Sequence, residues 1–299
     1  MNRYTVNPDE VYDVGIFTET PDDFLERIRH KEIERYAVQV IQTGEWAEIK
    51  IFPQWKKREY VPKKGQKTRE AQQKLNHKNA VHKLTRILNC NFAPYRDKFV
   101  TFTCDNDHLV LTDEEGFEMA EKGIRRIKYQ YKKAGVPLTA VYKVEIKRAK
   151  DSDGFLIRTA DGRQLYRPHL HIVLNSGVNP RKLLTGWKLG RNRRIEDLRW
   201  EPEGFLKLAA YLCKDTKAGK RRWSGTNNLI KPPPPRTVYT NKAGSKTRVG
   251  EVAANHSRWK EYFEQILPGY DFVQNETSIN EYYSGVYMHA RMAMKYKED

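Results

Sequence analysis

Two segments in which apolar and polar residues alternate, residues 139–147 and 165–174, constrain the fold of this chain most strongly. A period of two predicts strands that bury one face of a sheet. Ahead of them, residues 112–134 repeat apolar positions with helical spacing, and Thr112 with Glu115 has the spacing of a capping box. The apolar stripe of this helix is expected to be Phe117, Ala120, Ile124, Ile127 and Tyr131.

The same patterns place the neighbouring elements. Strands are expected at residues 98–103, 194–200 and 221–224, and a further helix at residues 205–214. The resulting order is strand, helix, strand, strand, a short helix, strand, helix, strand. This order predicts an α+β fold in which a central antiparallel sheet carries flanking helices, a ferredoxin-like layout.

Composition divides the chain into three expected regions. An N-terminal extension covers residues 1–97, the α+β domain covers residues 98–235 and ends at a run of four prolines, and an aromatic-rich C-terminal extension covers residues 236–299. The extensions are expected to hold a hairpin of two strands, a basic helix and a short C-terminal helix, at residues 36–42, 46–52, 68–89 and 257–265.

The chain is strongly basic, with 55 Lys and Arg against 38 Asp and Glu, a net charge of +17. Residues 54–98 hold 13 basic and 3 acidic residues, a net +10, and residues 181–222 hold 13 and 5, a net +8. Such blocks indicate a polyanionic partner, most simply nucleic acid. The first block is expected to track the phosphates of duplex DNA, or to be a solvated helix face at a domain junction.

Other classes of protein are excluded. No apolar run approaches the ~18 residues of a membrane-spanning helix, and the first eight residues lack the apolar stretch of a signal peptide. The three cysteines, Cys90, Cys104 and Cys213, lie far apart and form no C-x-x-C pair. This excludes a disulfide scaffold and a thiolate zinc site, and it favours a reducing cytoplasm.

A pair of histidines is the sharpest local motif. On the strand expected at residues 165–174, His169 and His171 project to one face, opposite Leu170. Two imidazoles can hold one divalent cation if a third ligand completes the site, and Glu145 on the preceding strand is the best candidate. The alternative is two partly exposed histidines that hydrogen-bond to the backbone.

A tyrosine flanked by lysines lies on the expected helix 205–214. Tyr211 and Lys214 share a helix face, and Lys207 lies one turn earlier. An ammonium beside a phenol suits nucleophilic attack on phosphate, because it stabilises the phenolate and the charge that develops at phosphorus. The alternative is an interfacial tyrosine between solvated lysines.

Together these motifs resemble the HUH endonucleases. The family has a strand ending in Pro-His-hydrophobic-His, here residues 168–171, and a helix with Tyr-x-x-Lys some forty residues later. A tyrosine that follows the histidines resembles the rolling-circle replication initiators of bacterial plasmids and small phages, whereas relaxases have the reverse order. Residues 99–103 and 222–229 resemble the family's first motif and the segment after its tyrosine helix.

The resemblance implies a mechanism. His169, His171 and Glu145 would hold Mg²⁺ or Mn²⁺, and Tyr211 would attack single-stranded origin DNA, which leaves a 5′-phosphotyrosine and a 3′-hydroxyl primer and later allows the strand to be rejoined. Lys214 would contact the phosphate or the tyrosine oxygen. Further DNA contacts are expected from Lys207, Arg221, Arg222 and Trp223, with Trp187 and Trp200 either stacking on bases or packing in the core.

The expected partners follow from what the chain contains. It has no G-x-x-x-x-G-K-[ST] loop, so a separate host or replicon-encoded helicase would unwind the DNA. Lys207 and Asp215 occupy the positions four residues from Tyr211, so the enzyme resembles a single-tyrosine initiator. The second strand transfer would come from another subunit of a homodimer, from water or from the 3′-hydroxyl. The rival functions are a single-tyrosine transposase or mobilisation nickase, and a non-catalytic DNA-binding regulator.

Overall fold

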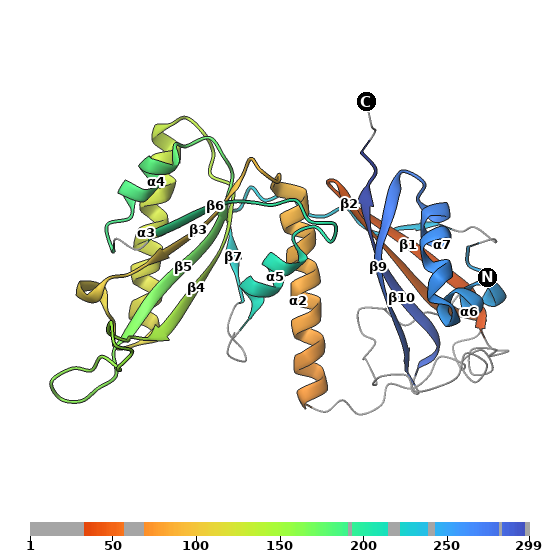
Figure 1. Ribbon diagram of the computed structural model, residues 1–299, viewed down its shortest axis with the longest axis horizontal. Helices are drawn as coiled ribbons and strands as arrows, with labels where there is room; N and C mark the ends of the chain where they lie inside the picture. The colour runs from red at the N-terminus through yellow and green to blue at the C-terminus, as the bar shows by residue number, and fades with distance from the viewer. Residues whose placement is uncertain are drawn as a thin grey trace. The chain divides into compact units, whose positions relative to one another are not determined.

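The computed structural model describes residues 33–56, 69–190, 193–214, 222–238, 243–280 and 283–296 (Figure 1). These residues belong to two compact units. The histidine unit comprises Asn91–Trp200 and Lys207–Ile230. The terminal unit comprises the described parts of Met1–Cys90, Glu201–Leu206 and Lys231–Asp299.

The histidine unit is built on a five-stranded sheet in the order β6-β3-β5-β4-β7, with every neighbouring pair antiparallel. Its strands are β3 (Lys98–Thr103), β4 (Ala140–Arg148), β5 (Tyr166–Leu174), β6 (Arg193–Asp197) and β7 (Ser224–Gly225). Its helices are α3 (Asp113–Lys133), α4 (Pro180–Gly186) and α5 (Leu206–Cys213), with a 3-10 turn η3 (Asn106–His108). The α+β class and the antiparallel sheet predicted from the sequence are confirmed.

Helix α3 begins where its sequence predicts. The Thr112 side chain accepts a hydrogen bond from the Glu115 backbone at 3.2 Å, and the Glu115 carboxylate accepts one from the Thr112 backbone at 3.3 Å. This capping box satisfies backbone donors that the first turn leaves unpaired. The helix buries Ile127 and Tyr131 against the sheet, together with α4.

One position of the predicted apolar stripe is wrong. Phe117 is 39% exposed, and the buried face of α3 instead includes Gly116 and Gly123. Gly123 lies directly beneath Trp187, which is 1% exposed and stacks on Phe102 with ring centroids 4.7 Å apart. Trp187 is therefore a core residue and not a base-stacking platform.

We expect Gly123→Ala to destabilise the histidine unit by about 1–3 kcal/mol, because overpacking a filled core forces its neighbours apart. An alanine Cβ at this position would lie 2.1 Å from Cζ3 of Trp187. The matched control is Gly186→Ala, whose Cβ would meet Gln130 Cγ at an ordinary 3.5 Å. Urea unfolding followed by tryptophan fluorescence checks both, and equal stability of the two variants would contradict the packing account.

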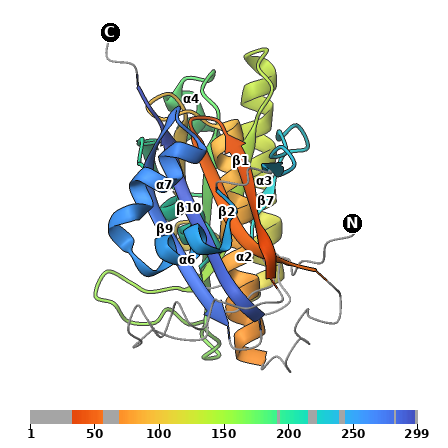
Figure 2. The same cartoon turned by 90° about the vertical axis from the view of Figure 1, so that its right-hand side faces the viewer.

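The terminal unit has its own antiparallel sheet, in the order β8-β1-β2-β10-β9. Its strands are β1 (Ile33–Thr43), β2 (Trp46–Trp55), β8 (Arg236–Val238), β9 (Tyr270–Asn280) and β10 (Tyr283–Met294). Its helices are α2 (Arg69–Asn91), α6 (Lys246–Ala254) and α7 (Trp259–Ile266), with a 3-10 turn η4 (His256–Arg258). Figure 2 shows α6 and α7 in front of this sheet and α2 behind it.

This sheet departs from the predicted division into regions 1–97 and 236–299. The predicted β1–β2 hairpin and the basic helix are present, but β10 pairs with β2 and β8 pairs with β1. The two extensions therefore form one unit. Composition shifts along the chain do not reveal hydrogen bonds between strands that lie about 200 to 250 residues apart.

No helix among the described residues combines the length and the apolar character needed to cross a bilayer.

Candidate functional site

Strand β5 places the two histidines on one face of the sheet in the histidine unit. His169 and His171 alternate with Leu170 and Ile172, which are fully buried on the opposite face with α3 and α4. The sheet therefore separates a helix-covered core from a polar face. The predicted orientation of the histidine pair is confirmed.

Each histidine is held by a threonine from the neighbouring strand β3. The antiparallel register pairs His169 with Thr103 and His171 with Thr101. Thr103 Oγ1 lies 3.0 Å from His169 Nδ1, and Thr101 Oγ1 lies 3.1 Å from His171 Nδ1. The rings are nearly parallel, with an interplanar angle of 9° and centroids 6.4 Å apart. A hydrogen bond at Nδ1 fixes a ring and leaves Nε2 for another partner.

Glu145 approaches His171 from the other side, on β4. Its Oε2 atom lies 3.2 Å from His171 Nε2 and 3.0 Å from the Lys147 ammonium. These hydrogen bonds, that of His171 first, lower the pKa of Glu145 to about 2 against the opposing effect of burial. Glu145 is therefore a carboxylate at neutral pH.

His169 stays neutral at the same pH. Its burial, reinforced by the positive charge of Lys147, lowers its pKa to about 4. A neutral imidazole keeps a lone pair that can bind a metal ion. The site thus offers imidazole nitrogens and one carboxylate, which is a donor set that suits Mg²⁺ or Mn²⁺.

Of the three predicted ligands, Glu145 and His171 lie at the spacing that a divalent cation requires. Adjacent ligands of an octahedral ion with bonds of about 2.1 Å lie about 3.0 Å apart, close to the 3.2 Å between Glu145 Oε2 and His171 Nε2. Across the described part of the chain, no three His, Cys, Asp or Glu side chains converge as a ready metal site. His169 lies beside the His171–Glu145 pair on the same face of the sheet.

Tyr211 of α5 lies against the same histidine. Its hydroxyl is 3.4 Å from His171 Nε2 and 3.5 Å from Nδ1, at the limit of hydrogen bonding. Its ring meets the His171 ring edge-on at 5.3 Å and the Phe99 ring edge-on at 6.0 Å. The residue is 44% exposed, so aromatic contacts orient its ring while part of the side chain remains open to solvent. The structure therefore brings Tyr211, His171 and Glu145 together.

The Tyr211 phenol is not activated by its surroundings alone. Burial, and then the charge of Glu145, raise its pKa above the usual value, and Lys147 partly counteracts them. The phenol is protonated at neutral pH, so attack requires removal of the proton or a further cation. The lysine whose charge favours the phenolate is Lys147, whereas Lys214 was the residue predicted for that role.

Lysines 143 and 214 connect α5 to the sheet. The Lys143 ammonium donates a hydrogen bond to the backbone carbonyl of Lys214, and the Lys143 side chain is buried. Lys214 itself follows the last turn of α5 with an exposed side chain. The contact fixes the end of the helix that carries Tyr211.

Two of the predicted DNA-contacting residues, Lys207 and Arg222, lie on or against α5. Lys207 is exposed on the helix, Arg222 donates to the Cys213 carbonyl at 3.5 Å, and Trp223 is half-buried just before β7. Arg221 lies outside the described residues. Trp200 is half-buried.

Several contacts of the site were not predicted from the sequence. The threonines at 101 and 103 were noted only as part of a resemblance, and the effect of Lys147 on the phenol was not foreseen. A usable signal existed, because Thr-x-Thr has the same two-residue period as His-x-His and the two strands were expected in one sheet. Phe99, two residues before Thr101 on β3, follows the same two-residue period and lies against His171 and Tyr211.

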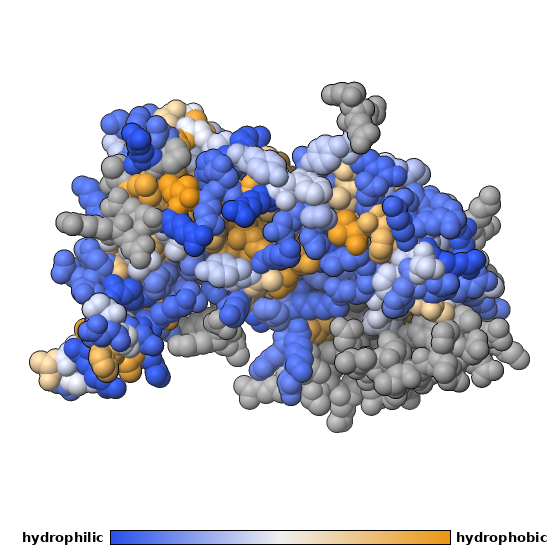
Figure 3. All heavy atoms as spheres, viewed as in Figure 1, coloured by the Kyte–Doolittle hydropathy of each residue, from blue (hydrophilic) through white to orange (hydrophobic). Residues whose placement is uncertain are grey.

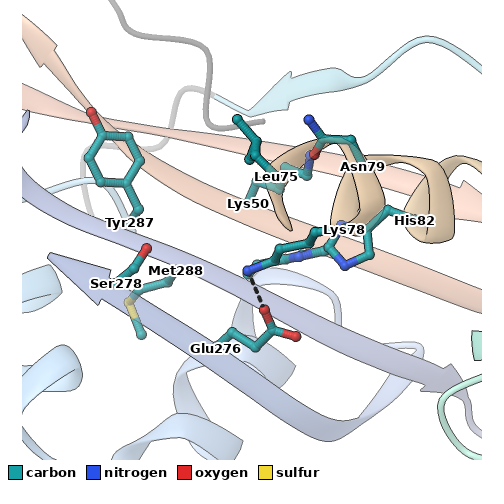
Figure 4. Close-up of a pocket in the computed structure, with 10 residues that line it drawn as sticks. Lys50, Leu75, Lys78, Asn79, His82, Glu276, Ser278, Tyr287 and Met288 are labelled. Atoms are coloured by element: carbon teal, nitrogen blue, oxygen red, sulfur yellow. Dashed lines mark ion pairs between the residues drawn. The ribbon is translucent and has the colours of Figure 1, made fainter. Parts of the chain in front are cut away.

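A second polar pocket lies in the terminal unit, between α2 and strands β9 and β10 (Figure 4). Lys78 of α2 forms an ion pair with Glu276 of β9 at 2.9 Å. The His82 and His289 rings meet edge-on at 4.8 Å, and burial lowers the pKa of both, that of His82 to about 2. Because these groups pair with one another, we interpret the pocket as part of the packing of α2 on its sheet.

Comparison of the chain with protein-family models, curated proteins and solved structures finds no match. What the histidine unit can do therefore follows from its geometry and chemistry.

Proposed function

We propose that the histidine unit is a metal-dependent strand transferase that nicks single-stranded DNA, and that the protein initiates rolling-circle replication. The observation that supports this most directly is the position of the Tyr211 hydroxyl, 3.4 Å from His171 Nε2. The same imidazole nitrogen contacts Glu145. A nucleophile, an imidazole and a carboxylate within reach of one another are the groups that phosphodiester transfer to tyrosine requires.

The reaction is an exchange of one phosphate ester for another. The Tyr211 oxygen forms a bond to phosphorus, the bond from phosphorus to the 3′-oxygen breaks, and the freed 3′-oxygen takes up a proton. A divalent cation bound by His169, His171 and Glu145 would supply a Lewis acid for the scissile phosphate. Lys147 favours the ionised phenol, and Thr101 and Thr103 hold the imidazoles in place.

The biological role rests on the order of the motifs in the chain. A tyrosine that follows the histidines resembles plasmid and phage initiators, so the proposed substrate is an unpaired origin strand. A cytoplasmic location, a separate helicase and a second subunit or water for the second transfer belong to the same proposal. Transposases and mobilisation nickases share the chemistry, so the fate of the cut strand separates the roles: an initiator nicks and rejoins one strand, whereas a transposase excises a defined element.

Covalent capture tests the chemistry. A randomised single-stranded library labelled at its 3′ end is incubated with the protein and Mn²⁺, and adducts are resolved on a denaturing gel. We expect label on the protein, because attack leaves the 3′ fragment attached through its 5′-phosphate. Absence of an adduct with both Mn²⁺ and Mg²⁺ would favour the non-catalytic DNA-binding regulator. Sequencing the captured strands identifies the cleaved site.

Removing the proposed ligands should abolish the metal dependence. We expect His171→Ala and Glu145→Gln each to lower the rate of adduct formation about 100-fold or more, because the Lewis acid contributes several kcal/mol to the transition state. Calorimetric titration with Mn²⁺ should show weaker binding in both variants. The control is His108→Ala in η3, on a histidine paired with Asp105. Unchanged Mn²⁺ affinity in the double variant His169→Ala, His171→Ala would contradict the ligand assignment.

A further inference from the structure

The chain between β4 and β5 forms a projection, residues 149–165, that continues beyond the sheet of the histidine unit. Figure 1 shows it as a yellow-green excursion past the ends of the two strands, and Figure 3 shows hydrophobic residues exposed among hydrophilic ones on the same protrusion. Both strands also carry the candidate site, with Glu145 on β4 and His169 on β5. The projection is therefore attached directly to the two strands that carry the proposed ligands.

Backbone hydrogen bonds give the projection a fixed shape. Ala149 donates to Leu165 at 2.8 Å, Ile157 donates to Ala149 at 2.9 Å, and Leu165 donates to Ile157 at 3.1 Å. Three short segments thus lie side by side, with further bridges from Lys150 to Leu156 and from Arg158 to Gln164. An extension paired in this way presents its tip in a defined position.

One of the two turns of the projection, residues 151–155, is held by Asp151, and we call this turn the tip. Asp151 Oδ1 accepts hydrogen bonds from the backbone of Asp153 at 3.0 Å and of Phe155 at 2.8 Å. The Asp151 backbone donates to the Phe155 carbonyl at 3.0 Å, and Gly154 adopts a φ of +88°, which a residue with a side chain rarely does. The backbone of Phe155 is fixed by these contacts although its side chain is not packed.

The tip presents an aromatic ring to solvent. Phe155 is 72% exposed and the neighbouring Leu156 is 37% exposed. Arg148 and Lys150 are exposed on the arm that leads to the tip, and neither forms an ion pair with another described residue. An exposed aromatic ring on a fixed backbone, close to exposed cations, is a combination that binds single-stranded nucleic acid, because the cations meet phosphates and the ring stacks on a base.

We propose that Phe155 stacks on a base of the single strand that enters the candidate site, and so holds that strand a few nucleotides from the scissile phosphate. Glu145 and Asp151 are six residues apart, at most about 20 Å along an extended strand, which corresponds to about six stacked nucleotides. That the bound strand is the one to be cleaved rests on the proposed function. Stacking of Phe155 on a base requires only that the base is unpaired.

Fluorescence anisotropy with a labelled single-stranded oligonucleotide tests the proposal in the full chain, without divalent metal so that no cleavage occurs. We expect Phe155→Ala to weaken binding about tenfold to a hundredfold, and Phe155→Trp to preserve it. Binding of a blunt duplex of the same sequence should change less than twofold, because its bases are already stacked. The control is Phe117→Ala, at the other exposed phenylalanine of this unit.

The outcomes separate this proposal from the proposed function. If no covalent adduct ever forms but Phe155→Ala still weakens single-strand binding, stacking holds and the endonuclease reading fails. If adducts form and Phe155→Ala binds single strands as the wild type does, stacking is overturned. A loss of binding to anionic lipid vesicles in Phe155→Ala, without any loss of oligonucleotide binding, would assign the tip to a membrane and also overturn it.

Discussion

Tyr211→Phe is expected to eliminate the covalent DNA adduct completely while leaving single-strand affinity within about twofold of the wild type. The substitution removes one oxygen atom, the one that lies 3.4 Å from His171 Nε2. The ring that remains can keep its edge-on contacts with His171 and Phe99. Because the side chain is 44% exposed, the change should not disturb the core. Denaturing gels with 3′-labelled strands measure the adduct, and anisotropy measures binding.

The matched control is Tyr129→Phe, which makes the same chemical change at a tyrosine that is 62% exposed on α3. We expect full adduct formation in this variant. An adduct that persists in Tyr211→Phe would show that another side chain is the nucleophile, and the assignment of the reaction to α5 would be wrong. Loss of the adduct in both variants would point to a general effect of removing hydroxyls and would equally contradict it.

Glu48→Gln is expected to cost the terminal unit about 3–5 kcal/mol of unfolding free energy, because it leaves buried cations without their counter-charge. Glu48 is 3% exposed, and its Oε2 atom accepts hydrogen bonds from Arg86 at 2.7 and 3.1 Å and from His289 at 2.9 Å. Its Oε1 atom lies 3.5 Å from the Arg291 guanidinium. Burial alone would raise the pKa of this carboxyl, but the hydrogen bond and charge of His289 and the charge of Arg86 hold it well below its usual value.

Urea denaturation followed by far-ultraviolet circular dichroism measures this loss. Glu118→Gln, at an exposed position of α3, makes the same chemical change outside such a cluster and should shift stability by less than about 0.5 kcal/mol. A loss below about 1 kcal/mol in Glu48→Gln would mean that water or neighbouring groups neutralise the cluster without the carboxylate.

Local patterns predicted the histidine unit well, because its signals are short-range. The alternation in β4 and β5 gave the direction of the histidines, and the Thr112–Glu115 spacing gave the start of α3. The exposed Phe117 was not predictable from periodicity, since Gly116 lets α3 approach Ile146 and Pro168 of the sheet, and Gly123 makes room for Trp187, on a face that an apolar count does not favour.

The terminal unit was predicted only in pieces. The β1–β2 hairpin and α7 follow from local signals, but the β9–β10 hairpin was not foreseen in the aromatic-rich tail. The partner of an edge strand depends on contacts across the whole chain, so no window of sequence contains it. In the site, Glu145 was placed near His169 and His171 by reasoning on one strand pair. The Thr-x-Thr period of β3 was a usable signal as well, but pairing it with the histidines also needed the neighbouring position of β3 and β5 in the sheet.

The sheet of the terminal unit cannot be completed until the end of the chain has been synthesised. Strand β2 leaves the ribosome early, but β10, which pairs with its open edge, is made more than two hundred residues later. At translation rates of about 5–20 residues per second, the β1–β2 hairpin exists for about 10–50 seconds before β10 is made, and during this time the β10-pairing edge of β2 is unpaired. The intervening segment, which contains the whole histidine unit, can fold during that interval. Unpaired edges attract other strands, so the yield of native protein should depend on what shields β2 while the chain is being completed.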